Sequence, residues 1–362
     1  MLTRRDLLAA GAASLAAAFP WPALASAREG LAKLAAQRGI LFGTATSTNQ
    51  LADNSFVPHL LRDASILVPE YEMKRALIQP EPGRFDFSHM DSLVEFAGAN
   101  GMAMRGHPLV WHKRNPDWLE GALLSSRKES LLTAYVQTLV SRYRGRMHSW
   151  DVVNEALALD GTTPMRGTVW LKAFGPEYID LAFHTAREAD PNALLVYNDW
   201  GCEAGASDAF RTRTLDFLES ALARGVPIQA YGMQGHLSAF GPQVDQKKLA
   251  DFIGHLKSMG LKLLVTELDV DDSGGPLDIA ARDRAVADAT RRFLDVAVDS
   301  PATLAVLTWG LSDRFLDPPG WRDVLKGYSP RTLPLDRDLN AKPMWDAIAD
   351  ALSRPRMRLS SD

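Results

Sequence analysis

Short apolar runs alternate with longer amphipathic stretches along the chain from residue 40 onward. The apolar runs are five to eight residues long and rich in β-branched side chains, and they predict strands at 40–46, 65–69, 102–109, 147–154, 193–199, 228–235, 262–269 and 304–310. The stretches between them predict helices. Eight strands alternating with helices are typical of parallel β/α folds, so we predict a single-domain α/β protein with a (β/α)8 TIM barrel.

Local signals place several helix faces and ends. One face of a helix within 129–146 carries seven apolar side chains: Leu131, Leu132, Tyr135, Val136, Leu139, Val140 and Tyr143. Ser88 followed by Asp91 predicts a helix start of the capping-box kind, and Gly101 predicts the end of that helix. Gly260 predicts the end of the helix before the seventh strand. An open doubly wound sheet is the alternative fold, but residues 43–45 do not form the glycine-rich phosphate loop that it favours.

Polar and aromatic side chains gather where the predicted strands end. In a β/α barrel the carboxyl ends of the strands meet at one face, where the active site lies. We therefore expect one mouth to bring together Glu70, Tyr71, Lys74, His107, Trp111, Asn154, Glu155, Asn198, Asp199, Trp200, Gln234, His236, Glu267, Asp269 and Trp309.

Two of these residues are glutamates that each close a buried strand, Glu155 after 149–154 and Glu267 after 263–266. A carboxylate in that position costs folding free energy unless it is hydrogen-bonded or paired. Two such carboxylates facing one cleft are what glycosidic bond cleavage requires, and a retaining pair stands about 5–5.5 Å apart.

The neighbours of the two glutamates predict different roles. Asp269 lies two residues after Glu267 on the same side of the strand, and His236 ends the adjacent strand, so an Asp–His–Glu chain of hydrogen bonds is possible. Such a chain keeps Glu267 ionised as a nucleophile. Glu155 has no basic neighbour in sequence, and burial beside a second carboxylate favours its protonated form, as a general acid requires. The structural alternative for His236 is a hydrogen-bonded core histidine.

Tryptophan rings supply flat apolar faces that suit sugar rings. We predict substrate contact for Trp111, Trp200 and Trp309 at strand ends, and core packing for Trp150. No H-E-x-x-H or Cys/His cluster occurs, so we predict neither a metal nor another cofactor.

Composition narrows the class of protein. With 46% hydrophobic and 23% charged residues, a net charge of −4 and a pI near 6.1, the chain is typical of a soluble globular protein. No long basic run occurs, so neither nucleic acid nor, for the mature form, a membrane is an expected partner. Cys202 is the single cysteine, which rules out an intramolecular disulfide. The oligomeric state stays open.

The first 27 residues are typical of an export signal. Arg4 and Arg5 precede an alanine-rich apolar stretch that ends near Phe19, and 25–27 offers a small-residue cleavage site. The paired arginines favour the twin-arginine route, with an ordinary secretory signal or an N-terminal anchor as alternatives. We predict a cleaved segment 1–27, a catalytic domain 28–362, and a periplasmic or secreted protein.

Two segments resemble the signatures of glycoside hydrolase family 10, the endo-1,4-β-xylanases: Trp150-Asp151-Val152-Val153-Asn154-Glu155-Ala156 and Val265-Thr266-Glu267-Leu268-Asp269. Further similar segments follow in the family's order over about 40–345: Glu72-Met73-Lys74, Gly106-His107-Pro108-Leu109-Val110-Trp111-His112, Asn198-Asp199-Trp200, Gln234-Gly235-His236 and Trp309-Gly310. The resemblance implies a TIM barrel that hydrolyses β-1,4-xylan or xylo-oligosaccharides with retention, through a covalent glycosyl-enzyme.

The resemblance also implies individual roles. Glu155 becomes the acid/base and Glu267 the nucleophile. Asn154 and Gln234 become partners of the sugar 2-hydroxyl and of the nucleophile. Lys74, His107 and Trp309 become contacts to the glycone sugars, and Trp200 an aglycone platform where the family usually has Tyr.

Several positions depart from the family pattern. Tyr71 replaces an Asn that contacts glycone hydroxyls, Lys113-Arg114 replaces Ser-Gln, Gly201 replaces Asn, and Trp321 does not fall at the usual spacing after Trp309. We expect Tyr71 and Arg114 to reach the glycone end of the cleft, where Arg114 could pair with a glucuronic acid. A solvated Arg114, or one paired with Glu70 or Asp117, is the alternative.

Two other functions stay open on the sequence. The same glutamates could serve a hydrolase or transglycosylase acting on another β-glycoside. A non-catalytic carbohydrate-binding barrel is the alternative outside enzymes, although the presence of both glutamates with Asn154, Gln234 and His236 disfavours it.

Overall fold

The computed structural model describes residues 29–205, 208–316 and 328–354. The predicted export signal at 1–27 and the departure at Trp321 lie outside these residues. Within the described ranges, no helix is long and apolar enough to cross a lipid bilayer.

Parallel strands form the centre of the molecule: β1 (Leu41–Thr46), β2 (Ile66–Pro69), β3 (Ala103–Gly106), β4 (Ser149–Asn154), β5 (Leu194–Asp199), β6 (Ala230–Met233), β7 (His236–Ser238), β8 (Lys262–Asp271) and β9 (Thr303–Thr308). Neighbours pair in the order β6-β5-β4-β3-β2-β1-β9-β8, and a further pairing of β6 with β8 closes the ring. The short β7 pairs with β8. The predicted eight-stranded barrel is therefore confirmed, and the open doubly wound alternative is wrong.

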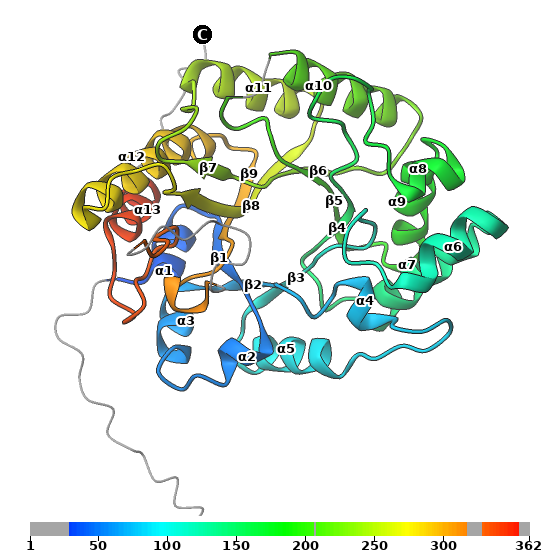
Figure 1. Ribbon diagram of the computed structural model, residues 1–362, viewed down its shortest axis with the longest axis horizontal. Helices are drawn as coiled ribbons and strands as arrows, with labels where there is room; N and C mark the ends of the chain where they lie inside the picture. Colours follow the sequence, from blue (N-terminus) through cyan, green and yellow to red (C-terminus); the bar gives the residue numbers. More distant parts are fainter. Residues whose placement is uncertain (1–28, 206–207, 317–327, 355–362) are drawn as a thin grey trace, which may run out of the picture.

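Helices surround the ring of strands (Figure 1). They are α1 (Leu31–Gln37), α2 (Thr48–Leu51), α3 (Val57–Asp63), α4 (Arg75–Ile78), α5 (Ser88–Ala99), α6 (Asp117–Ser126), α7 (Ser130–Arg142), α8 (Val169–Phe174), α9 (Tyr178–Ala189), α10 (Asp208–Ala223), α11 (Gln246–Ser258), α12 (Ile279–Ala297), the 3-10 turn η1 (Asp313–Phe315) and α13 (Pro343–Ser353). In α7, the predicted apolar face is buried apart from Leu131, which is partly exposed.

The core has two layers, because each strand points alternate side chains inward and outward. The inner layer fills the barrel with eight buried apolar side chains: Ala45, Ile66, Val68, Val196, Ala230, Leu264, Ala305 and Leu307. The outer layer lies between strands and helices and includes Trp150, as predicted from its sequence position. A filled barrel leaves the strand ends as the place for a substrate site.

The sixth predicted strand is shorter than expected. It was predicted at 228–235, but β6 ends at Met233 and the chain turns at Gly235, which has φ +82. This left-handed conformation strains residues with a Cβ atom, so glycine suits it. After the turn, β7 places His236 opposite Asp269 of β8.

The capping box predicted at Ser88 is wrong. Ser88 is the first residue of α5, and the N-cap residue Phe87 makes no side-chain cap. The Asp86 carboxylate accepts a local hydrogen bond from the Ser88 backbone N–H at 3.0 Å. Asp91 instead accepts hydrogen bonds from Arg142 and from the Tyr143 hydroxyl, so it ties α5 to α7. The predicted helix ends are confirmed: Gly101 and Gly260 follow α5 and α11 with φ of +66 and +81.

Candidate active site

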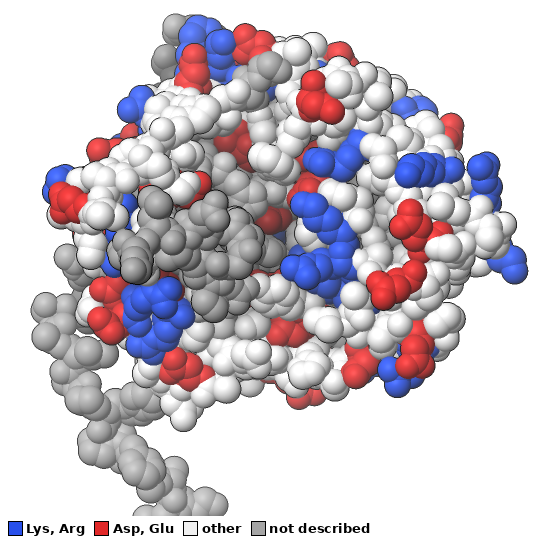
Figure 2. All heavy atoms as spheres, in the orientation of Figure 1, with Lys and Arg blue, Asp and Glu red and all other residues white. Residues whose placement is uncertain are grey.

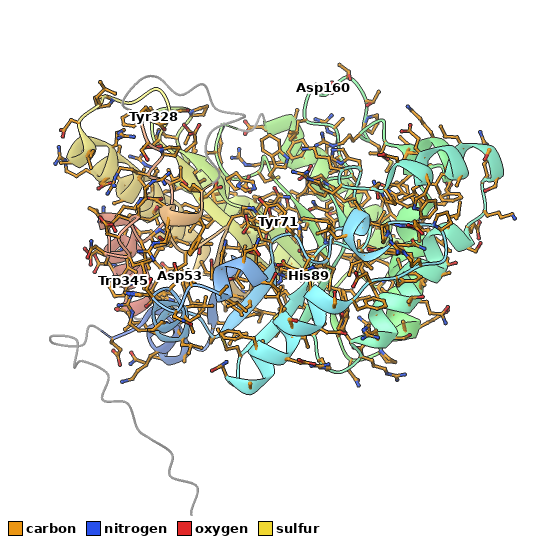
Figure 3. All side chains as sticks on the ribbon, turned by 60° about the horizontal axis from the view of Figure 1, so that its bottom comes forward. Asp53, Tyr71, His89, Asp160, Tyr328 and Trp345 are labelled. Atoms are coloured by element: carbon orange, nitrogen blue, oxygen red, sulfur yellow. The ribbon has the colours of Figure 1, made fainter. Side chains whose placement is uncertain are left out.

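A cleft of about 480 Å³ opens at the carboxyl ends of the strands. Thirteen of the side chains expected there line it: Glu70, Tyr71, Lys74, His107, Trp111, Asn154, Glu155, Trp200, Gln234, His236, Glu267, Asp269 and Trp309. Asn198 and Asp199, the other two, are fully buried and do not line it. In the view of Figure 3, Tyr71 lies toward the centre and Asp160 at the upper edge. The strand ends therefore bring together side chains that are far apart in sequence.

Glu267 is buried, and several polar side chains surround its carboxylate. Its Oε1 atom accepts a hydrogen bond from Asn198 Nδ2 at 2.7 Å, and its Oε2 atom lies 3.4 Å from His236 Nε2. Burial favours the protonated carboxyl, but His107 at 3.9 Å, His236 and the nearby Lys74 outweigh it and lower the pKa of Glu267 to about 2. Glu267 is therefore ionised across the neutral range, as a nucleophile must be.

His236 joins Glu267 to Asp269. Its Nδ1 atom lies 2.9 Å from Asp269 Oδ1, while Nε2 faces Glu267. Burial disfavours the imidazolium, but the two carboxylates outweigh burial and raise the pKa of His236 well above its ordinary value. The predicted Asp–His–Glu chain is present in the geometry. The alternative of a hydrogen-bonded core histidine is wrong, because the His236 side chain is partly exposed and lines the cleft.

Glu155 has a strained backbone, with φ +57. A residue with a Cβ atom in this region costs about 1–3 kcal/mol, and such strain concentrates at functional sites. Two hydrogen bonds hold the strained peptide: the Glu155 N–H donates to Asn198 O at 2.9 Å, and Arg166 Nε donates to Glu155 O at 3.0 Å. The turn aims the carboxyl into the cleft, where His112 Nε2 lies 3.9 Å from Oε2.

The amides around the two glutamates are arranged differently from the expectation. Gln234, expected beside the sugar or the nucleophile, has its Nε2 atom 3.3 Å from Glu155 Oε1. The Asn154 side-chain amide lies 2.9 Å from Asn198 Nδ2 and 3.2 Å from Gln234 Nε2, with the Trp111 indole N–H 3.1 Å away. The amide that contacts the nucleophile is therefore Asn198.

Asn198 was placed at the mouth by the sequence but given no role. The Thr266 hydroxyl donates to its Oδ1 atom at 2.7 Å, which leaves Nδ2 to donate to Glu267. Gly232 of the neighbouring strand makes room for this amide, since a Cβ atom there would lie 2.2 Å from Asn198 Oδ1. Gly232 was the residue in the sequence that could have indicated this close contact with Asn198.

A buried charged group behind His107 was also missed. Asp151 accepts from Arg105 Nη2 and lies 2.8 Å from His107 Nδ1, and all three side chains are buried. Burial and the charge of Lys74 lower the pKa of His107, whereas Glu267 and Asp151 act in the opposite direction. Arg105 in β3 and His107 directly after β3 are two residues apart, and this spacing was the signal in the sequence.

Two tryptophans and a lysine form one wall of the cleft. Lys74 Nζ lies 4.8 Å from the ring centre of Trp111 and 5.3 Å from that of Trp309. Burial lowers the pKa of Lys74 to about 8, against the opposing effect of the carboxylates. Trp200 lies apart from this wall and is 37% exposed, which leaves a ring face open to a ligand.

Arg114 does not reach the cleft. It lines a second cavity of about 440 Å³, together with His112, Arg166 and Lys172, whereas Lys113 lines the cleft itself. The expectation of Arg114 at the glycone end is therefore wrong, because its backbone turns at φ +55. Arg114 forms no ion pair with Glu70, Asp117 or any other residue in the described ranges, so the paired alternative is also wrong.

The chain is similar to proteins of a known family. Residues 30–351 match the model of glycosyl hydrolase family 10. The chain belongs to glycosyl hydrolase family 10. It is 36% identical to endo-1,4-β-xylanase B of Thermotoga neapolitana over 296 residues, which cover 80% of this chain and 81% of that protein.

Solved structures of the family share the architecture. The crystal structure of xylanase 10B from Thermotoga maritima has a TM-score of 0.80 and 33% identity, covering 89% of this chain and 98% of that one. Xylanase 10B from Thermotoga petrophila RKU-1, in complex with xylobiose, has a TM-score of 0.81 and 32% identity, covering 90% and 98%. The family assignment makes the chain a glycoside hydrolase with a TIM-barrel fold, as the sequence predicted.

Proposed function

We propose that the protein is an endo-acting β-1,4-xylanase that works with retention of anomeric configuration. The observation that carries the proposal is the pair Glu155 and Glu267, facing one cleft with opposite surroundings. Glu267 is stabilised as a carboxylate by Asn198 and His236, while Glu155 has no cationic side chain at hydrogen-bonding distance among the described residues. The xylanase relatives and the xylobiose complex support xylan or xylo-oligosaccharides as substrate.

The reaction takes two displacements. In the first, a Glu267 oxygen attacks the anomeric carbon, the glycosidic C–O bond breaks, and Glu155 gives its proton to the leaving oxygen. In the second, Glu155 takes a proton from a water molecule, whose oxygen attacks the same carbon and releases Glu267. Two inversions give net retention, and the first step requires a carboxylate at Glu267 and a proton on Glu155.

The other residues of the cleft bind the sugars. Asn154, with its amide beside both Trp111 and Gln234, suits the 2-hydroxyl of the sugar under attack. Lys74, His107 and Trp309 surround the glycone position, and the open ring of Trp200 suits an aglycone sugar. Among the described residues, no group of three or more His, Cys, Asp or Glu is arranged to hold a metal ion.

One experiment tests both reaction and substrate. Purified mature protein is incubated with linear xylan, glucuronoxylan, arabinoxylan, mixed-linkage glucan and cellulose, and the first products are identified by size and by the NMR signal of the new anomeric proton. We expect internal cleavage of the xylans and an initial β-anomer. An α-anomer would contradict the double displacement. Faster cleavage of a glucan than of every xylan would instead favour the open alternative of another β-glycoside.

We also propose export through the twin-arginine route, on the basis of Arg4 and Arg5 before the alanine-rich segment. A change of both arginines to lysine in the expressed chain should retain the precursor in the cytoplasm. Unchanged export would contradict this route.

A further inference from the structure

A basic ridge separates the catalytic cleft from the second cavity. It consists of His112, Lys113 and Arg114, which follow β3. The two exposed cations lie on opposite sides of the ridge, because Lys113 lines the cleft and Arg114 lines the second cavity. Figure 2 shows Lys and Arg side chains gathered beside the central hollow on the side of these loops.

Two residues that line the second cavity each have one buried polar atom without a partner. Arg166 Nη2 and His112 Nδ1 are both buried, and neither has a hydrogen-bond partner within the described residues. Lys172 and Arg114 add positive charge to the wall, and Asp117 and Glu120 oppose it in part.

The cations lack the partners that usually neutralise surface charges. Lys113, Arg114, Arg166 and Lys172 form no salt bridge with any described residue. Lys113 Nζ lies 5.5 Å from the ring centre of Trp111, within the cleft that receives sugar. A negatively charged group placed on the ridge would therefore lie between Lys113 and Arg114. Neither cation would have to break a salt bridge to interact with it.

The ridge is also close to the reacting bond. His112 lies 3.9 Å from the Glu155 carboxyl, and Arg166 binds the Glu155 carbonyl. A side group on a sugar bound beside Glu155 could therefore lie over the ridge while the main chain occupies the cleft. The cavity volume of about 440 Å³ is within the range of pockets that hold small ligands.

We propose that Arg114 binds the carboxylate of a uronic acid side group, with Lys172 on the same cavity wall adding positive charge, and that this contact makes acidic xylan the preferred substrate. The inference rests on the proposed xylanase function. A carboxylate suits the site because a guanidinium donates two parallel hydrogen bonds to it. The neutral hydroxyls of an undecorated chain gain nothing from these charges.

The test compares three oligosaccharides with one xylose backbone: undecorated, carrying one glucuronic acid, and carrying the same side group with its carboxyl reduced to an alcohol. The reduced substrate preserves size and removes charge. For the native enzyme we expect kcat/KM on the acidic substrate to exceed that on the reduced one at least about threefold at low salt. The preference should shrink between about 20 mM and about 500 mM salt, because exposed charges are screened.

Arg114→Glu should lower kcat/KM on the acidic substrate about tenfold relative to the reduced one, and Arg114→Gln should lower it about threefold. Arg127→Glu is the matched control. Arg127 is likewise an exposed arginine with positive φ, at +48, but it follows α6 and lines neither cavity, so the ratio should not change. Melting temperatures of all three variants verify folding.

The outcomes separate this inference from the proposed function. Equal native rates on acidic and reduced substrates, or equal losses on both in the Arg114 variants, would overturn the uronate site while leaving a xylanase. Cleavage of none of the three substrates by folded enzyme would instead overturn the xylanase function.

Discussion

The imidazole of His236 pairs with the carboxylate of Asp269 at 2.9 Å. The pair exists because β7 and β8 run side by side with these two residues in register. Through its other nitrogen, 3.4 Å from Glu267, the ring carries the influence of Asp269 to the reaction centre. Asp269 is thus a positioning residue that acts on Glu267 through His236.

The first prediction concerns this relay. Asp269→Asn removes one of the charges that raise the pKa of His236, so the imidazolium supports Glu267 less and the pKa of Glu267 rises from about 2. Protonated Glu267 is inactive, and the acid limb of kcat/KM should therefore move up by about one pH unit. Asp288→Asn, an exposed change on α12, is the control and should leave the profile in place.

The same shift has a consequence for stability. The folded-state pKa of Glu267 is below its ordinary value of 4.5, so its contribution is complete above pH 4.5 and is lost as the pH falls toward 2. Asp269→Asn should narrow this window, and the variant should lose less stability than the native protein between those pH values. If the acid limb of kcat/KM does not move in Asp269→Asn, the charge of Asp269 does not act on Glu267 through His236.

The contacts of Asp269, His236 and Glu267 also show which parts of the site can be predicted from the sequence. Side-chain alternation predicted Glu267 and Asp269 on one side of β8, and the strand order predicted His236 beside them. It did not predict the turn at Gly235, because a positive φ depends on how the loop closes over its neighbours. The same limit explains the misplacement of Arg114, whose neighbour Lys113 lines the cleft. Asp151 was missed because its ion pair with Arg105 depends on strand register, which a sequence pattern does not contain.

The second prediction tests the nucleophile. Glu267→Gln keeps the size of the side chain but removes the attacking oxygen's charge, so turnover should fall by a factor of about 10⁴ or more. Steady-state hydrolysis of an aryl β-xylobioside measures the loss, and circular dichroism verifies folding. Activity near that of the native enzyme in a folded variant would exclude Glu267 as nucleophile.

The third prediction tests the acid/base. Glu155→Ala should still form the glycosyl-enzyme from substrates with a good leaving group, since these need no protonation. The second step should then stall, and added azide should restore turnover with a β-glycosyl azide as product. An α-azide, or no rescue on any substrate, would assign the acid/base role elsewhere.

The fourth prediction concerns Lys74, whose pKa is lowered to about 8. Its charge is lost as the pH rises through 8, so kcat/KM should fall on the alkaline side. Lys74→Met should lower kcat/KM at pH 7 and abolish that limb. The variant should also melt at a higher temperature at pH 7, because a buried ammonium costs folding free energy.

The expected rise in melting temperature of Lys74→Met depends on pH. The unfolded chain binds the Lys74 proton more tightly than the folded protein between pH 8 and 10.5, so native stability rises with pH in that window. The advantage of Lys74→Met should shrink correspondingly. A melting difference that does not depend on pH would attribute the effect to packing instead of charge.

The last prediction concerns Tyr71, which lines the cleft and is 38% exposed. The family usually has Asn here, whose amide offers both a donor and an acceptor to sugar hydroxyls, whereas Tyr offers one hydroxyl on a large ring. A hydrogen bond to a substrate hydroxyl is worth about 1 kcal/mol, so Tyr71→Asn should raise kcat/KM on undecorated xylo-oligosaccharides several-fold. Tyr71→Phe is the matched control, because it keeps the ring and adds no amide, and it should not raise kcat/KM. If Tyr71→Asn is no faster than the native enzyme, Tyr71 does not limit binding of the linear chain.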